Sequence, residues 1–358
     1  MRLETLINQV RANCQVASAR QAGLFSLCGT LLRLRQLFKW EHQLPPWREP
    51  EPEAVIAWIE LKERAWDCLE AVPWQHLTWG ETSFEPFAVE ALNRHLLPQG
   101  LAYGAGLSRG LSPTFFLGEL AQVRKINGLT ILVLGPEQAR DLDGTPALCQ
   151  GRLIYARKET LAFYVWERLS DPVQQNNPFL TIALDAYQIP LKSLLKDPEA
   201  HQEQLQALLA GELEAVIHHE MGEALEPSLK DAFATILKLY PQTRLEHWVR
   251  GLKDALAEVN DWGRLSYLIR ERQLPSLGLM LAWRPGLYPL LLPELEPAFW
   301  EVAAGGDWDR LDQARTQALT RLRQVAAGLN KLLASRRSAS PQWTRGEIER
   351  QYLTPLGL

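Results

Sequence analysis

The sequence has few cysteines, and none of them are close together. Its 358 residues include four cysteines, at positions 14, 28, 68 and 149, with no Cys-x-x-Cys spacing. Zinc ribbons and redox motifs need closely spaced pairs, and disulfide frameworks are typical of small secreted domains. We therefore expect reduced, buried thiols rather than a disulfide or a zinc framework.

Long apolar runs and a large excess of charge are also lacking. The most apolar stretch, 274–293, is interrupted by Arg284 and several prolines, so it falls short of the roughly 18 uncharged residues of a membrane span. The first residues, MRLETLINQVRANC, are charged and amphipathic, unlike a secretory signal. We expect a cytoplasmic protein with no membrane segment.

The charge balance disfavours nucleic acid as a partner. The formal net charge is −4, so no general electrostatic attraction to phosphates exists. The chain has 13 tryptophans, which could stack on bases only beside a basic groove. The tryptophan-rich segment 47–66 is instead rich in acidic residues, and we expect its tryptophans to fill gaps between helices.

The chain changes character near residue 98. Residues 1–97 have the periodicity of helices, whereas 98–157 alternates glycines with short β-branched and aromatic runs. Asn127-Gly128 and Gln150-Gly151 predict two hairpins, with a short helix beginning at Pro136 between them. The strand–helix alternation of a doubly wound α/β domain is missing from the sequence.

The remaining half is rich in helix signals. Asp197-Pro198 predicts a helix start, and Thr243 with Glu246 forms a capping box. We predict an α+β fold that is predominantly α-helical, with a small central antiparallel β-sheet flanked by N- and C-terminal helical parts. We expect an N-terminal α+β domain over 1–170, a linker over 171–190, and a C-terminal helical domain over 191–358. The N-terminal domain is expected to consist of helices in 1–97, a β-rich segment over 98–157 and a helix over 158–170.

The stretch AVIHHEMGEALEP, residues 215–227, is the main candidate for a functional site. On a helix, Glu220 falls within a stripe of apolar side chains, where an apolar residue is expected. A buried carboxylate needs a cation, a donor or a metal ion nearby. The stripe consists of Leu205, Leu209, Leu213, Val216, Ile217 and Ala224.

His219-Glu220-x-x-Glu223 resembles the HExxH helix of zinc proteases, with its second histidine replaced by glutamate. The resemblance implies His219 and Glu223 as metal ligands and Glu220 as the general base. A glutamate ligand favours a harder divalent ion such as iron, manganese or magnesium. A third ligand is not evident: His247, Asp254 and Glu258 share a face of the next helix, but we interpret that face as the solvated side of an amphipathic helix.

The alternative is a structural role for the same stretch. One glutamate would pair with Arg250, Arg264 or Arg270 from another helix and fix how the helices dock. Under this interpretation the protein acts through binding or assembly, with an unknown protein partner or self-association. The competing hypothesis is a metal-dependent hydrolase that uses His219, Glu220 and Glu223.

Glycines at 104–110 imitate two further motifs. They resemble a dinucleotide fingerprint and, with Ser108, the G-x-S-x-G elbow of serine hydrolases. Neither is followed by a predicted helix. We expect these glycines to bend a small sheet instead.

Overall fold

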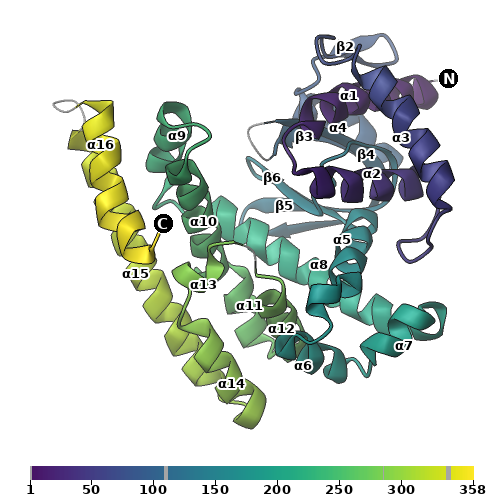
Figure 1. The fold of residues 1–358 in the computed structure, drawn as a ribbon. Coiled ribbons are helices and arrows are strands. Elements are labelled where there is room, and N and C mark those ends of the chain that lie inside the picture. Colours follow the sequence, from purple (N-terminus) through teal and green to yellow (C-terminus); the bar gives the residue numbers. More distant parts are fainter. Residues whose placement is uncertain (1, 109–111, 285, 336–339) are drawn as a thin grey trace. The chain divides into compact units, whose positions relative to one another are not determined.

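The computed structural model describes residues 2–108, 112–284, 286–335 and 340–358. The chain forms two compact units, Met1–Ser170 (unit 1) and Asp171–Leu358 (unit 2). Unit 1 combines helices with β-strands, whereas the regular elements described in unit 2 are helices (Figure 1). The fold is therefore α+β and predominantly helical, as the sequence predicts.

Unit 1 contains five α-helices, a short 3-10 helix (Leu97–Gln99) and seven strands within its described residues. The helices are α1 (Arg2–Ala22), α2 (Leu27–Glu41), α3 (Pro52–Trp66), α4 (Val89–Leu96) and α5 (Lys158–Ser170). The strands are β1 (Leu77–Trp79), β2 (Thr82–Phe84), β3 (Leu101–Leu107), β4 (Pro113–Ile126), β5 (Leu129–Arg140), β6 (Ala147–Gln150) and β7 (Leu153–Arg157).

The larger sheet has the strand order β3-β4-β5-β7-β6. Both hairpin predictions are confirmed: β4 and β5 are joined by Asn127-Gly128, and β6 and β7 by the two residues after Gln150. Asn127 and Gly128 have φ angles of 50° and 73°, as a tight hairpin turn requires. The described pairings are antiparallel except that between β5 and β7, which is parallel.

Two local predictions in unit 1 are wrong. The first 97 residues are not helical throughout, because β1 and β2 form a hairpin with three residues in each strand, too short to show alternation in the sequence. The helix expected at Pro136 is part of β5. Pro136 falls at an irregularity, between the pairs Leu120↔Leu134 and Gly118↔Glu137, where the missing N–H of proline interrupts no regular ladder.

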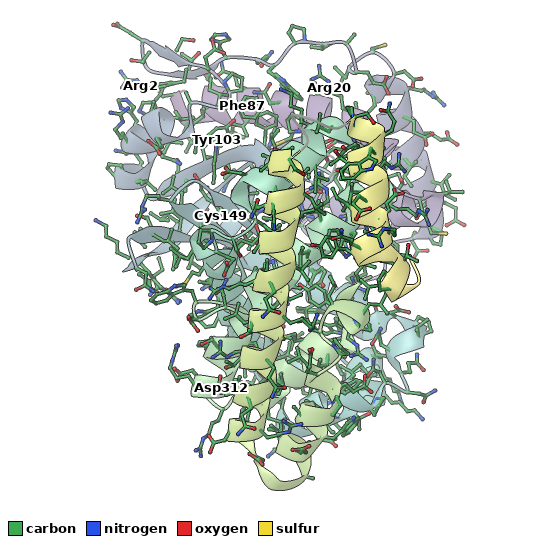
Figure 2. The ribbon with its side chains drawn as sticks, turned by 90° about the vertical axis from the view of Figure 1, so that its left-hand side faces the viewer. Arg2, Arg20, Phe87, Tyr103, Cys149 and Asp312 are labelled. Atoms are coloured by element: carbon green, nitrogen blue, oxygen red, sulfur yellow. The ribbon has the colours of Figure 1, made fainter. Side chains whose placement is uncertain are left out.

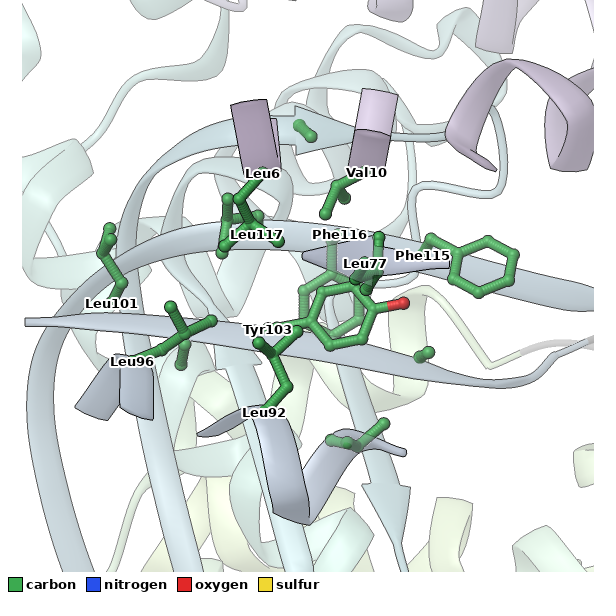
Figure 3. Packing of buried hydrophobic residues seen from close by; sticks show 14 of the residues in the cluster. Leu6, Val10, Leu77, Leu92, Leu96, Leu101, Tyr103, Phe115, Phe116 and Leu117 are labelled. Atoms are coloured by element: carbon green, nitrogen blue, oxygen red, sulfur yellow. The ribbon is translucent and has the colours of Figure 1, made fainter. Parts of the chain in front are cut away.

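Side chains from α1 and α4 converge on the strands to form the core of unit 1 (Figure 3). Leu6 comes from α1 and Leu92 from α4, and both belong to one buried cluster with Tyr103 and Phe116 of the sheet. A Cβ at Gly104 would overlap the ring of Phe116, so this glycine serves close packing within the sheet. The G-x-S-x-G and dinucleotide-like patterns extend into 109–111, outside the described residues.

Unit 2 contains eleven α-helices within its described residues. They are α6 (Pro178–Ala186), α7 (Leu191–Lys196), α8 (Gln202–Leu225), α9 (Lys230–Leu239), α10 (Arg244–Val259), α11 (Arg264–Arg270), α12 (Leu274–Ala282), α13 (Tyr288–Leu291), α14 (Leu295–Gly305), α15 (Trp308–Ser335) and α16 (Pro341–Ile348). Thr243 caps α10 as predicted, because its Oγ1 accepts from the Glu246 N–H. The reciprocal bond is shifted by one residue, since Glu246 accepts from the N–H of Gln242 rather than from that of Thr243.

The segment 171–190 differs from the linker expected there. It holds a 3-10 turn over Pro172–Gln174 and helix α6, in which Phe179 and Leu180 are buried. A Cβ at Gly278 of α12 would lie 2.8 Å from the carbonyl oxygen of Phe179, so α6 and α12 pack closely. The polar and proline-rich sequence that suggested a linker supplies the caps and the first turn of a packed helix.

The cysteines differ from the expectation in their burial. All four are free thiols, but only Cys14 is buried, while Cys28 and Cys68 are exposed. Cys149 on β6, labelled in Figure 2, is half-buried.

None of the helices in the described ranges has both the length and the apolar composition that crossing a membrane requires.

Candidate functional site

Helix α8 carries the candidate residues, and it is enclosed on more than one side. It packs against α10, α11 and α12, so its buried positions do not form the single stripe predicted. The carboxylate buried on this helix is Glu212, which is 3% exposed, whereas Glu220 is only half-buried. The prediction that Glu220 is the misplaced charge in the apolar stripe is therefore wrong.

His219 connects two helices through its ring nitrogens. Nδ1 lies 3.0 Å from Oε1 of Glu258 on α10. Nε2 lies 3.5 Å from Oε1 of Glu223, one turn further along α8. The ring is thereby oriented between a carboxylate of another helix and a carboxylate of its own helix. His218 points elsewhere and stacks on Tyr267 of α11 with ring centroids 4.1 Å apart.

Glu258 is the most densely bonded carboxylate of the site. Its side chain is fully buried, and it accepts from Arg264 Nε at 2.7 Å and from the Tyr288 hydroxyl at 2.9 Å. Arg264 also donates to it through Nη2. The interpretation of this face of α10 as solvated is wrong for Glu258, because the face is turned toward α8 and its neighbours.

Glu223 and Asp254 complete the site beside His219. Glu223 forms an ion pair with Lys253 of α10. One ligand atom each from His219, Glu223 and Asp254 lies within 4.8 Å of the other two. The side chains of His219 and Glu223 are 20% and 19% exposed, so solvent reaches the site on one side.

The pKa values of the neighbouring carboxylates are pushed in opposite directions. Burial raises the pKa of each, but in Glu258 and Glu223 it is outweighed. Arg264 and His219 hold the pKa of Glu258 far below its usual range, and His219 and Lys253 lower the pKa of Glu223 to about 2. Burial and the charge of Glu223 raise the pKa of Asp254 to about 6. Such divergence among close carboxylates is typical of functional sites as well as of structural ion-pair networks.

The histidine has a strongly shifted pKa too. Burial lowers the pKa of His219, but the carboxylates of Glu258 and Glu223 outweigh it and raise the pKa well above its usual value. The positively charged or ionisable groups that face the carboxylates of Glu258, Glu223 and Asp254 are therefore His219, Lys253 and Arg264.

The donor set fits a divalent cation. Ligand atoms bound to one ion at about 2.1–2.3 Å lie about 3–4.6 Å apart, close to the spacing found here. One imidazole nitrogen with two carboxylates suits manganese, iron or zinc, and the oxygens suit magnesium. Glu258 accepts from the other ring nitrogen of His219, as carboxylates behind metal-bound histidines do.

The structure brings together two of the three predicted residues and adds others. His219 and Glu223, the two predicted ligands, belong to the cluster, and Asp254 supplies its third donor atom. Glu220, the predicted general base, is not one of these three residues. The sequence showed Asp254 and Glu258 on one face of α10, four residues apart, yet gave no sign that another helix covers this face. Of the three arginines considered as partners, Arg264 enters the site, but it pairs with Glu258.

Two family models match the chain. The N-terminal domain of a family of unknown function, DUF6866, matches residues 5–157, and the C-terminal domain of the same family matches residues 162–351. No curated protein and no solved structure matches the chain.

Proposed function

The chain belongs to the DUF6866 family, and we propose that it is a binding protein whose unit 2 takes up a divalent cation at His219, Glu223 and Asp254. The observation that carries this proposal is the convergence of three donor atoms within 4.8 Å of one another, from two helices. Acidic residues near a surface often gather without an ion, but here a histidine nitrogen joins them in a half-buried position.

Glu258 supports the proposal by its position behind the histidine. It lies 3.0 Å from Nδ1 of His219, so in the neutral ring the proton is held on Nδ1 and the lone pair on Nε2. Nε2 is the nitrogen that faces Glu223. Arg264 and Tyr288 in turn fix Glu258, and such outer contacts commonly contribute a factor of about 10–100 to metal affinity.

Lys253 is the internal competitor of the ion. Its ammonium group pairs with Glu223. It thus supplies one positive charge at the position where a divalent cation would supply two. Lysine holds a point charge on a flexible chain, so it can turn away toward solvent when an ion takes its place. The proposed uptake therefore exchanges a lysine contact for a metal–carboxylate bond.

Metal-dependent hydrolysis is the second candidate. Glu220 follows His219 directly, as the base follows the first ligand in HExxH helices. Burial lowers the pKa of Lys253, and the carboxylates of Glu223, Asp254 and, least of all, Glu220 outweigh it, so the charge of Glu220 acts on the site. In this mechanism a metal ion held by His219, Glu223 and Asp254 would lower the pKa of a water molecule, and Glu220 would accept the proton from that water.

The deciding experiment is a calorimetric titration of metal-free, full-length protein with Mn²⁺ and Zn²⁺, with elemental mass spectrometry of the isolated complex. We expect one ion per chain in the wild type and a loss of affinity of at least about tenfold in His219→Ala and Asp254→Asn. Glu214→Gln, on the same helix but outside the cluster, is the matched control and should bind as the wild type does.

The variant Glu220→Gln distinguishes the two candidate functions, cation binding and metal-dependent hydrolysis. This variant should keep the cation in both cases, and only under the hydrolase hypothesis should it lose a metal-dependent hydrolytic activity. Failure of the wild type to bind either ion, or equal binding by His219→Ala, would remove both candidates. The cluster would then be a device for docking α8 on α10. A cytoplasmic location and a protein partner or self-association are further parts of the proposal.

A further inference from the structure

Unit 1 contains a cavity of about 680 Å³ among α1, the end of α2, β5 and α5. This volume is in the range of sites for small organic molecules. Part of its wall is apolar and aromatic, and part is charged. The apolar part includes Trp40, Leu44, Pro45, Pro136 and Phe163.

Arg140, at the end of β5, is the unusual residue of this wall. It is 4% exposed, and its Nε and Nη1 have no hydrogen-bond partner among the residues that the structure describes. Its guanidinium carbon lies 5.6 Å from the ring centroid of Trp40 and 5.2 Å from that of Phe163. Stacking on aromatic rings holds the group in place but leaves its donors unused, and unused buried donors cost free energy.

Arg157 of the same unit is a buried arginine whose guanidinium group does have hydrogen-bond partners. It donates to both oxygens of Glu137, at 2.5 and 3.0 Å, and to the carbonyl oxygen of Thr145 at 2.9 Å. Thr160 donates to Glu137 as well. Glu137 is therefore fully committed to Arg157 and Thr160, and Arg140, three residues along β5, is left with free donors.

The other charges of the wall determine which ligand fits. Glu41 pairs with Lys62 at 2.6 Å, so it adds no net charge. Glu159 accepts from Trp40 Nε1 at 3.2 Å and from the backbone N–H of Glu137 at 2.9 Å. Arg11 donates Nε to the carbonyl oxygen of Gln138. Arg140 and Arg11 against Glu159 leave a net charge of one positive unit, which favours a monoanion over a phosphate dianion.

We propose that this cavity binds a small organic carboxylate, whose anionic group pairs with Arg140 and whose apolar part lies against Trp40 and the prolines. Arginine suits this role because its charge is permanent and its planar donors match a carboxylate. The site is separate from the proposed cation site and does not depend on it.

The test is a calorimetric titration of the full-length chain with benzoate, with benzyl alcohol and inorganic phosphate as comparison probes. We expect saturable binding of benzoate and none of benzyl alcohol, because only benzoate supplies the anion. In Arg140→Met, benzoate affinity should fall at least about tenfold, since a charge-assisted pair is lost. Arg11→Met, at the exposed edge, should weaken binding less.

Melting temperatures distinguish a variant that has lost the ability to bind benzoate from one that fails to fold. Without ligand, Arg140→Met should melt at the same temperature as the wild type or higher, because it removes a buried charge that lacks a partner. With benzoate, only the wild type should gain thermal stability. No binding of benzoate at millimolar concentration, equal binding by Arg140→Met, or preference for phosphate would each overturn the proposal.

Discussion

Both units bury charged side chains, but they do so on different frameworks. In unit 1 the charges belong to two strands, β5 and β7, and to the helix α5 that follows the sheet; we call Glu137, Arg140, Arg157 and Glu159 the sheet cluster. In unit 2 they come from helices; we call His219, Glu223, Lys253, Asp254, Glu258 and Arg264 the helix cluster. The sheet cluster leaves the donors of Arg140 unused, whereas the helix cluster leaves a carboxylate, Asp254, with a raised pKa.

This difference indicates the charge of the ligand that each unit can bind. A buried arginine with unused donors beside a cavity favours an anion as its ligand. Carboxylates around a histidine favour a cation as their ligand. The two proposed sites thus take ligands of opposite charge, and in each the group proposed to bind, Arg140 or Asp254, is one that the closed pairs leave over. Arg157 takes both oxygens of Glu137 in unit 1, and Arg264 takes Glu258 in unit 2.

The largest effect is expected from breaking the closed pair of the sheet cluster. Arg157→Met should destabilise unit 1 by about 3–5 kcal/mol, because it leaves Glu137 buried without its counterion. Arg140→Met should change the free energy of unfolding by less than about 1 kcal/mol, or raise it, since no pair is broken. Urea unfolding followed by tryptophan fluorescence compares them. Equal losses of unfolding free energy in the two variants would show that Arg140, like Arg157, takes part in a stabilising pair.

The corresponding change in the helix cluster is Glu258→Gln. It removes the buried counterion of Arg264 and leaves His219 with Glu223 alone, so we expect a loss of about 3 kcal/mol. The control is Glu301→Gln, which breaks an exposed ion pair with Arg310 and should cost less than about 1 kcal/mol. Circular dichroism during urea unfolding measures both. A loss no larger than that of the control would mean that the network does not hold α8 on α10.

A third test uses the pH dependence of stability through Glu212, the buried carboxylate of α8. Burial raises its pKa from 4.5 to about 7, and Ser276 and Arg264 lower it only in part. Tyr187 and Glu258 are the other ionisable groups that interact with it. The unfolded chain releases this proton near its ordinary pKa, whereas the folded chain keeps it to about pH 7. The stability contributed is therefore complete below the lower pKa and is lost as the pH rises toward the higher one, by roughly 3 kcal/mol.

Glu212→Gln should remove this loss. Unfolding free energies at about pH 5 and about pH 8 should then differ less in the variant than in the wild type, by up to roughly 3 kcal/mol. An unchanged difference would mean that Glu212 is ionised in the folded protein at neutral pH. Unit 2 would then hold a further buried negative charge, on Glu212.

The smallest effect is expected from Lys253→Met. Removing the ammonium that pairs with Glu223 should tighten Mn²⁺ binding severalfold, equivalent to about 1 kcal/mol, because the ion no longer displaces a competitor. The same calorimetric titration measures it. Weaker binding in this variant would show that Lys253 positions Glu223 for the ion rather than competing with it.

Local chemistry alone determined a large part of this fold. The two hairpin turns follow from residues that accept positive φ or tight turns, such as Asn127 and Gly128, and the start of α10 follows from the capping box of Thr243 and Glu246. The predominance of helix and the β-rich middle segment follow from the periods of apolar residues. These features depend on neighbours in sequence, so the sequence contains the information needed to predict them.

Burial was decided only by the tertiary structure. A helical period shows one apolar stripe, but α8 is covered by three helices, and this made Glu212 the buried carboxylate and left Glu220 at the edge. The same enclosure turned Glu258 and Asp254 from an apparently solvated face into the partners of His219. Pro136 lies in a strand because an irregularity in the β4–β5 pairing accommodates it. Each outcome depends on which distant segment lies opposite, and no pattern within one helix or strand records that.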